Sequence, residues 1–293
     1  METPEALERS IGTAEELHSV VRTMKTLSST SIRQYDRAVS AMGHYVRTVE
    51  LGFRVLLRGM AIPSDGPSDE ARPIGLIVFG TDRGFCGPFN RDIAAFAADW
   101  LGARAPDVDR RLACLGTHLA PELELRGEAA TTVARMPSSV EGIVGSVQTL
   151  LLELDEWQAR GVERITMFHH RPAEEHTHKP EVTQLIPLDG EWLRSLARRP
   201  WPTREIPTSY LEPRTLLTAL TREYVFASLY RAHAESLASE HAARLDAMRS
   251  AEQTIEERLD ELEQRYHQVR QAAITEELLD VTSGFEAMEQ EGG

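Results

Sequence analysis

The sequence predicts a long antiparallel coiled coil of N- and C-terminal helices with an inserted open α/β (Rossmann-like) domain. Both ends of the chain carry apolar residues that alternate four and three positions apart, which is the spacing of a narrow coiled-coil seam. In the middle of the chain, short apolar runs alternate with helical patterns, which is typical of a small sheet with crossover helices. We therefore expect a coiled-coil helix over 1–62, an α/β domain over 63–207 and a second coiled-coil helix over 208–293.

The N-terminal helix is predicted from a segment without proline, Leu7 to Met60. Its isolated glycines weaken the helix by roughly 1 kcal/mol each relative to alanine. A stripe as narrow as the one it carries buries against a single partner helix rather than against a broad core. The seam positions are Tyr35, Val39, Met42, Val46, Val49, Phe53, Leu56 and Met60.

The C-terminal helix is predicted from a run without glycine or proline, Arg214 to Ser283. At about 1.5 Å per residue this run forms a rod on the order of 100 Å long. Because neither helix can bury its stripe alone, we expect the two to wind around each other antiparallel. The heptad phase drifts near Ser31 and Ala251, so two unrelated amphipathic helices packed on a globular core are the alternative. The seam positions are Ile255, Leu259, Leu262, Tyr266, Val269 and Ala273.

The α/β domain follows a linker, Pro63–Pro73, that is rich in proline, glycine and acidic residues. Asn90 is the expected N-cap of one helix, and Ser138 with Glu141 forms a capping box for another. The alternation of strands and helices favours parallel strands joined by crossover helices. The predicted strands are Ile74–Phe79, Leu112–Leu115, Thr131–Ala134, Val162–Phe168 and Val182–Leu188.

Composition excludes several classes of protein. The chain is 41% hydrophobic and 27% charged, which is ordinary for a globular protein, and no stretch approaches the roughly 20 apolar residues of a membrane span. A net charge of −14 argues against a nucleic-acid partner. The N-terminus does not resemble a signal peptide, and two cysteines do not make a disulfide framework. Acidic residues cluster over 252–263, where a solvated helix face is the simpler interpretation and a docking surface for a basic partner is the alternative.

The turn Gly80–Gly87 after the first strand is the first candidate for chemistry. It lacks both the dinucleotide-binding glycine pattern and a P-loop, so we interpret it as a structural turn in which Gly84 and Gly87 supply positive φ angles. Cys86 beside Arg83 can be interpreted as a thiol nucleophile with a lowered pKa. No positioned base is visible in the sequence, so a packed small side chain is the preferred interpretation of Cys86.

The second candidate is the segment His169–His178, which holds His169, His170, His176 and His178 with two glutamates. Such a set can bind zinc or nickel, and a polar hairpin between two strands is the simpler alternative. We expect no metal and no cofactor, because no third ligand set or open catalytic position can be argued. The sequence therefore offers no convincing active site.

Two C-terminal segments, Ala238–Met248 and Arg270–Gly284, resemble the gamma subunit of F-type ATP synthases. The turn Asp82–Gly87 and the helix entry Tyr210–Pro213 are similar to that family too, and the likeness covers nearly the whole chain in the same order. It implies that the coil is the central shaft that rotates inside a hexamer of three alpha and three beta subunits. The α/β domain is then at the foot of the shaft, near the epsilon subunit and the membrane rotor ring.

The resemblance also implies a mechanism without a catalytic residue in this chain. The asymmetric coil presents a different face to each beta subunit and so shifts three copies of one site among different states. The chain is then a peripheral protein on the cytoplasmic side of a bacterial inner membrane. Positions that match the hexamer contacts of the family are Met24, Arg244, Gln271, Thr275, Glu277 and Asp280.

Some positions depart from the family pattern. His267 stands where asparagine is usual, and Glu15–Val21 replaces a segment rich in lysine, asparagine and threonine. These departures and the acidic shaft suggest a divergent branch, such as the alternative bacterial ATPases thought to move sodium. Proton against sodium, and synthesis against hydrolysis, stay open. Two other classes also stay open: a non-rotating coiled-coil adaptor, and an α/β nucleotide-binding enzyme with helical extensions.

Overall fold

The computed structural model describes residues 3–58, 73–104, 108–173, 178–205 and 208–291; beyond Leu279, the only side chain described is that of Thr282. The chain divides into two compact units. The first combines residues up to Leu27 with those from Leu245 onward, and the second comprises Ser28–Arg244. The predicted division at 62/63 and 207/208 stays a prediction.

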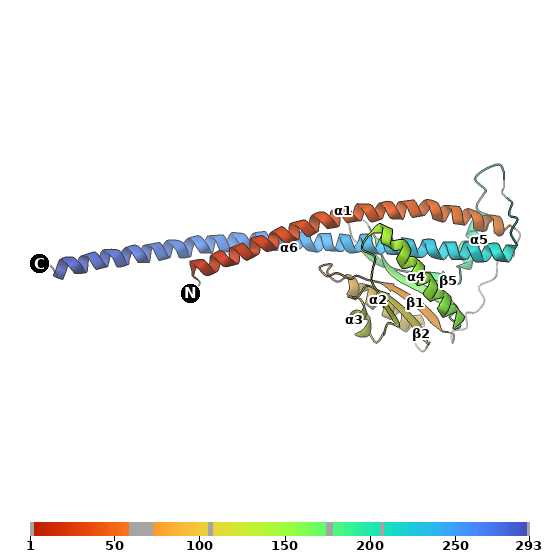
Figure 1. Ribbon diagram of the computed structural model, residues 1–293, viewed down its shortest axis with the longest axis horizontal. Coiled ribbons are helices and arrows are strands. Elements are labelled where there is room, and N and C mark those ends of the chain that lie inside the picture. The colour runs from red at the N-terminus through yellow and green to blue at the C-terminus, as the bar shows by residue number, and fades with distance from the viewer. Residues whose placement is uncertain (1–2, 59–72, 105–107, 174–177, 206–207, 292–293) are drawn as a thin grey trace. The chain divides into compact units, whose positions relative to one another are not determined.

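Two long helices lie near the two ends of the sequence: α1 (Pro4–Leu56) and α6 (Pro213–Glu291). They pair antiparallel within each unit. In the first unit, Lys25 meets Glu252 and His18 meets Glu256, so residue numbers rise along one helix as they fall along the other. In the second unit, the ring of Tyr35 stacks on His241 at 5.7 Å and the hydroxyl of Tyr45 donates to Glu223, which gives the same antiparallel direction. The predicted class of terminal helices with an inserted α/β sheet is confirmed (Figure 1).

The inserted sheet has five strands in the order β3-β2-β1-β4-β5. The first four are parallel, whereas β4 and β5 pair antiparallel, so the sheet is mixed rather than parallel throughout. The reason is the short connection between β4 and β5, which is long enough for a hairpin but too short for a crossover helix. The strands are β1 (Ile74–Phe79), β2 (Arg110–Leu115), β3 (Thr132–Ala134), β4 (Arg164–Pro172) and β5 (His178–Ile186).

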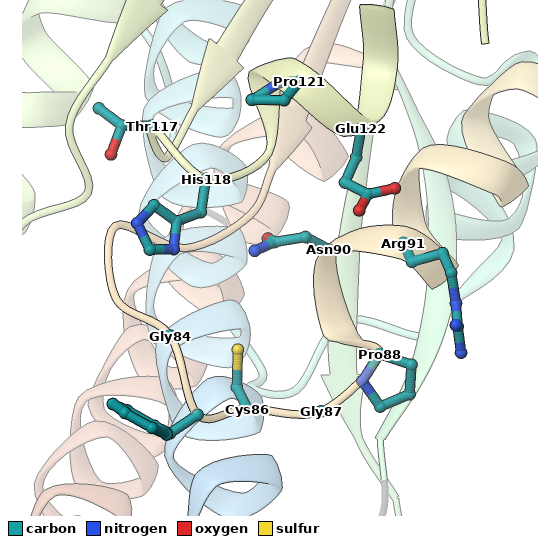
Figure 2. A pocket seen from close by; sticks show the side chains of 11 residues that line it. Gly84, Cys86, Gly87, Pro88, Asn90, Arg91, Thr117, His118, Pro121 and Glu122 are labelled. Atoms are coloured by element: carbon teal, nitrogen blue, oxygen red, sulfur yellow. The ribbon is translucent and has the colours of Figure 1, made fainter. Parts of the chain in front are cut away.

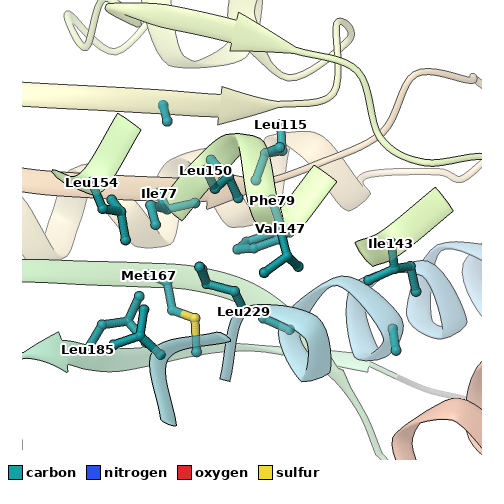
Figure 3. Packing of buried hydrophobic residues seen from close by; sticks show 14 of the residues in the cluster. Ile77, Phe79, Leu115, Ile143, Val147, Leu150, Leu154, Met167, Leu185 and Leu229 are labelled. Atoms are coloured by element: carbon teal, nitrogen blue, oxygen red, sulfur yellow. The ribbon is translucent and has the colours of Figure 1, made fainter. Parts of the chain in front are cut away.

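Both faces of the sheet are covered, because successive side chains of a strand point to opposite faces. Leu76 and Val78 of β1 pack against α2 (Phe89–Arg104) and α3 (Ala120–Glu124). Residues on the other face form the largest core with α4 (Val140–Ala159), α6 and part of α1, and Figure 3 shows α4 and α6 side chains meeting the sheet there. The residues labelled in that view are Ile77, Phe79, Leu115, Ile143, Val147, Leu150, Leu154, Met167, Leu185 and Leu229.

Two of the predicted helix starts are wrong in detail. The helix predicted from Asn90 begins at Phe89, and the side chain of Asn90 bonds elsewhere. The N-cap of α4 is Ser139 rather than Ser138, and its hydroxyl makes no capping hydrogen bond. A helix that the sequence analysis missed, α5 (Gly190–Arg198), is capped by Asp189, whose carboxylate accepts hydrogen bonds from the backbone N–H groups of Glu191 and Trp192.

One stretch of α6, Ala232–Arg244, is buried on all sides except at His241, which is partly exposed. The sheet covers one side of this stretch, and Tyr35 and Ala38 of α1 belong to the same core. Such close approach from several directions requires small side chains on the helix. Those in this stretch are Ala232, Ala234, Ser236, Ala238, Ser239, Ala242 and Ala243.

Candidate functional site

The turn after β1 lies where α/β proteins commonly bind ligands, at the carboxyl ends of parallel strands. Here the turn is occupied by bonds within the chain. One oxygen of Asp82 accepts hydrogen bonds from the backbone N–H and the hydroxyl of Thr117, at 2.8 and 3.0 Å. The other oxygen accepts from the backbone N–H of Met136 at 2.7 Å. Because Thr117 follows β2 and Met136 follows β3, the carboxylate of Asp82 ties three strand ends together.

Asn90 closes the same turn from the opposite side. Its carbonyl oxygen accepts a hydrogen bond from the backbone N–H of Thr81 at 3.0 Å, and its amide donates to the Thr81 hydroxyl at 2.8 Å. That hydroxyl donates to the backbone carbonyl of Arg83 at 2.9 Å. Asn90 therefore shapes the turn instead of capping α2.

The backbone of the turn differs from the prediction at one glycine. Gly87 has φ of 60°, as predicted, but Gly84 does not have a positive φ. Phe85 takes that conformation instead, with φ of 61°. A bulky residue seldom adopts the left-handed region, and the Phe85 side chain is 70% exposed, so burial of its ring does not compensate for the strain.

Arg244 of α6 contacts this turn. Its Nε donates to the carbonyl of Gly84 at 3.3 Å and its Nη2 to the carbonyl of Arg83 at 3.5 Å. Its Nη2 also pairs with Glu240, one helical turn away. Arg244 is only 4% exposed and Glu240 only 5%, so this is a buried ion pair with further hydrogen bonds. Arg244, predicted as a contact with the hexamer, thus uses its donors within the chain.

Cys86 does not have the properties of a nucleophile. Its thiol is buried, and burial raises its pKa, the opposite of the lowered value that the nucleophile interpretation requires. The sulfur lies 3.9 Å from the Thr81 hydroxyl and packs with Phe89 and Ala243. The preferred interpretation, a packed small side chain, agrees with these contacts.

A cavity of about 400 Å³ lies beside the turn, and Figure 2 shows the side chains of Cys86, Asn90 and His118 around it. Its lining selects no single charge of ligand, because it holds both Arg91 and the carboxylate of Glu122, which pairs with Arg126 at 3.0 Å. Pro88, also in the lining, has no backbone N–H to offer to a phosphate.

A second cavity, of about 440 Å³, lies between the turn and α6. Its lining mixes the basic side chains Arg83 and Arg135 with the acidic side chains Asp82 and Glu240. Both acids already accept hydrogen bonds from within the chain. The lining therefore selects no single charge of ligand.

In the described part of the segment His169–His178, the histidines make contacts within the protein. His169 pairs through Nε2 with Glu235 of α6 at 2.9 Å, and His170 places its Nε2 2.9 Å from the carbonyl of Phe89. Burial lowers the pKa of His170 to about 3. His178 lies against His170 at a centroid distance of 4.6 Å, and His176 lies outside the described residues. These described histidines do not converge on a common point with a third ligand.

In the first unit, the acidic stretch of α6 faces basic groups of α1. Lys25 pairs with Glu252 and lowers its pKa, and His18 Nε2 lies 3.3 Å from Glu256. His18, Glu252 and Glu256 also form the one group among the described side chains with the donor types and proximity to hold a metal ion. Lys25 competes there for Glu252, so the arrangement is explained as an ion-pair network. The acidic residues of 252–263 are thus partly neutralised across the coil.

The seam of α1 in this unit was not recognised in the sequence. Its positions continue the alternation of four and three, but polar side chains occupy several of them, which hides the pattern from a search for apolar residues. Met24, next to Lys25, is half-buried. The seam positions of this unit, all with reduced exposure, are Leu7, Ile11, Ala14, His18, Val21 and Lys25.

The remaining predicted contact positions lie near the end of α6. Gln271, Thr275 and Glu277 are exposed, and the Thr275 hydroxyl donates to the carbonyl of Gln271 at 2.8 Å. Asp280 belongs to α6, but its side chain lies outside those described. Exposed leucines and an isoleucine lie among these polar residues, so this end of the helix presents both polar and apolar groups to solvent.

Comparison with known proteins decides the family. Residues 3–288 match the sequence profile of the ATP synthase family. The chain belongs to this family. The profile is that of the F-type gamma subunit, so the resemblance predicted from the two C-terminal segments is confirmed over nearly the whole chain.

Solved structures similar to this ATP synthase family member share its fold. A chain of the mitochondrial ATP synthase rotor of Euglena gracilis in rotational state 1 matches with a TM-score of 0.63 and 14% identity, over 92% of this chain and 98% of that one. A chain of the OSCP/F1/c-ring assembly of the same organism in rotational state 3 gives 0.62 and 16%, over 97% and 94%. A chain of the Tetrahymena thermophila central stalk/c-ring gives 0.54 and 15%, over 79% and 99%.

Proposed function

We propose that the chain is the central rotor shaft of an F-type ATP synthase or ATPase. It couples ion translocation through a membrane ring to ATP synthesis or hydrolysis at an alpha/beta hexamer by rotation. The observation that carries this proposal is the family match over residues 3–288. The similar solved chains come from assemblies described as rotor, central stalk/c-ring and F1/c-ring, which supports the same role and the same partners.

The chain contributes no catalytic site of its own to this reaction. Support comes from the turn after β1, where a nucleotide site is expected in an α/β fold. The carboxylate of Asp82 and the amide of Asn90 bond within the chain, and the thiol of Cys86 is buried with a raised pKa. In this proposal the α/β domain is a structural part of the rotor that is attached to the shaft.

Contacts with the hexamer are assigned to side chains that are free to reach a partner. Gln271, Thr275 and Glu277 are exposed on α6, and Met24 is half-buried on α1. We include Asp280, which follows at helical spacing from Glu277. The polar groups of the four α6 residues can bond to beta-subunit loops without forming a large adhesive apolar interface, which suits a surface that must slide.

Arg244 is left out of this contact set. Its guanidinium is 4% exposed and is engaged by Glu240 and two backbone carbonyls. A contact with the hexamer would require these bonds to break, and the cost of leaving Glu240 unpaired and buried opposes that.

We place the protein at the cytoplasmic side of a bacterial inner membrane, held there through its complex. No helix within the described ranges is long and apolar enough to cross a membrane.

Within the complex, residues 1–62 and 208–293 serve as the coiled coil and 63–207 as the α/β domain.

Co-expression with the alpha and beta subunits tests the proposal. One copy of this chain is expected to purify with three alpha and three beta subunits, and ATP hydrolysis should be lost when the chain is omitted. Rotation of a label attached to the α/β domain at Leu125, which is 81% exposed, should accompany hydrolysis. A stable complex whose hydrolysis proceeds without rotation would indicate an adaptor, and ATP hydrolysis by the isolated chain would indicate an enzyme.

A further inference from the structure

We propose that Glu240 and Arg244 are positioning residues that clasp the Arg83–Gly87 turn to α6. They hold the turn in its strained conformation with the ring of Phe85 directed outward. The inference rests on the proposed function in one respect: if α6 is part of a turning shaft, the clasp makes the turn move with it as one body.

The turn is attached to α6 on both sides of Phe85. Before Phe85, Arg244 donates to the carbonyls of Arg83 and Gly84. After it, Cys86 is buried against Ala243, the residue that precedes Arg244 on the helix. Two adjacent residues of α6, Ala243 and Arg244, therefore hold the segment on both sides of Phe85.

The contacts with α6 flank Phe85, the residue of the turn whose backbone conformation is unfavourable for its type. Phe85 has φ of 61°, and its ring is 70% exposed, so neither residue type nor burial favours this conformation. An outlier of this kind persists when surrounding bonds fix it. The buried guanidinium of Arg244, oriented by Glu240, is the group in position to do so.

The two cysteines of the chain give a direct test, because both are buried in different places. Cys86 lies under the clasp and is 4% exposed, whereas Cys114 lies in β2 and is 0% exposed. Labelling of the isolated full chain with a maleimide, resolved by mass spectrometry, measures opening of the turn at Cys86 and opening of the sheet at Cys114. We expect R244M to accelerate labelling of Cys86 at least about tenfold, the effect of losing a charge-assisted hydrogen bond, and to leave Cys114 unchanged.

A matched control exists on the same helix. Arg231 forms a pair of the same sequence spacing with Glu235 at 2.8 Å; its side chain is 44% exposed where that of Arg244 is 4%, and the pair contacts His169 and not the turn. R231M should therefore leave the labelling of both cysteines unchanged. R244K keeps the charge but not the forked donors, so Cys86 should label at an intermediate rate.

A loss of global stability is distinguished from clasp opening by Cys114. R244M leaves Glu240 buried and unpaired, and a resulting loss of stability would accelerate the labelling of both cysteines. The double variant E240Q/R244M removes that charge, so faster labelling of Cys86 with unchanged labelling of Cys114 in this variant reports opening of the clasp. Labelling of Cys86 that is unchanged in both variants, or that rises in parallel with Cys114 in both, overturns the proposal.

The proposed function is tested separately. Because labelling uses the isolated chain, failure to assemble with alpha and beta subunits would overturn the rotor role and leave the clasp intact. In the assembled complex, R244M should lower the ions transported per ATP hydrolysed relative to R231M. Equal values for the two variants would show that the clasp does not contribute to coupling.

Discussion

Asp82 gives the sharpest test of how the α/β domain is held together. Its carboxylate accepts three hydrogen bonds from residues that follow two other strands. In D82N one acceptor oxygen becomes an N–H₂ donor, so either Met136 or Thr117 faces a donor instead of an acceptor. Met136 is buried, and an unsatisfied buried N–H costs about 1–3 kcal/mol in addition to the lost charge-assisted bond. We expect D82N to lower the free energy of unfolding by about 2–3 kcal/mol, or the melting temperature by about 4–12 °C.

Tryptophan fluorescence during urea or thermal unfolding measures this effect. All four tryptophans lie within Ser28–Arg244, so the signal reports the unit that contains Asp82. D99N is the matched control, because Asp99 is exposed on α2, and it should change the free energy by less than about 0.5 kcal/mol. If D82N unfolds at the same urea concentration as D99N, the carboxylate does not tie the strand ends as argued.

Three further predictions concern the same unit, all measured by urea unfolding. Burial lowers the pKa of His233 to about 4, below the value of about 6.5 in an unfolded chain, so the unfolded state binds more protons between these values. The contribution of His233 should be fully present above about pH 6.5 and fall by up to about 1.4 kcal/mol per pH unit toward pH 4; His170 and His241, whose pKa values burial lowers to about 3 and about 4, act in the same direction, and equal stability at both ends of this window would contradict the reasoning. G116A should cost about 2–3 kcal/mol, because Gly116 has φ of 109° and an added Cβ lies 2.5 Å from the Thr81 nitrogen. G145A has open space on α4 and should stabilise by up to about 1 kcal/mol, so a loss comparable to that of G116A would refute the steric argument. F53A should cost about 3–5 kcal/mol, since Phe53 is fully buried, and a loss below about 1 kcal/mol would mean that its cluster repacks.

How well each element could be predicted depended on its surroundings. The strand Ile74–Phe79 was predicted with its observed bounds, because it is apolar throughout and Pro73 and Gly80 delimit it. The edge strand β5 was predicted to begin four residues late and to end two residues late. Polar residues such as Lys179 and Glu181 occupy its first half, which an edge strand tolerates but a search for apolar runs does not detect.

The site could be predicted in its parts but not in its connections. Residue types identified the turn Gly80–Gly87, whereas Arg244 was singled out separately, by the family resemblance, as a contact with the hexamer. Their contact joins Arg244 to Gly84 across 160 positions of sequence, and no local pattern carries that information. The positive φ of Phe85 could not be predicted either, because it depends on this distant support rather than on the preference of the residue itself.

The buried stretch Ala232–Arg244 of α6 constrains how the gene can change. An α-helix rotates each successive residue by about 100°, so inserting or deleting one residue between Glu235 and Arg244 would rotate one of them relative to the other, and the helix could not keep both Glu235 against His169 and Arg244 against Gly84. No single substitution elsewhere could restore both contacts. We expect insertions and deletions among relatives to be absent from this stretch and to accumulate in surface connections such as the one between α5 and α6.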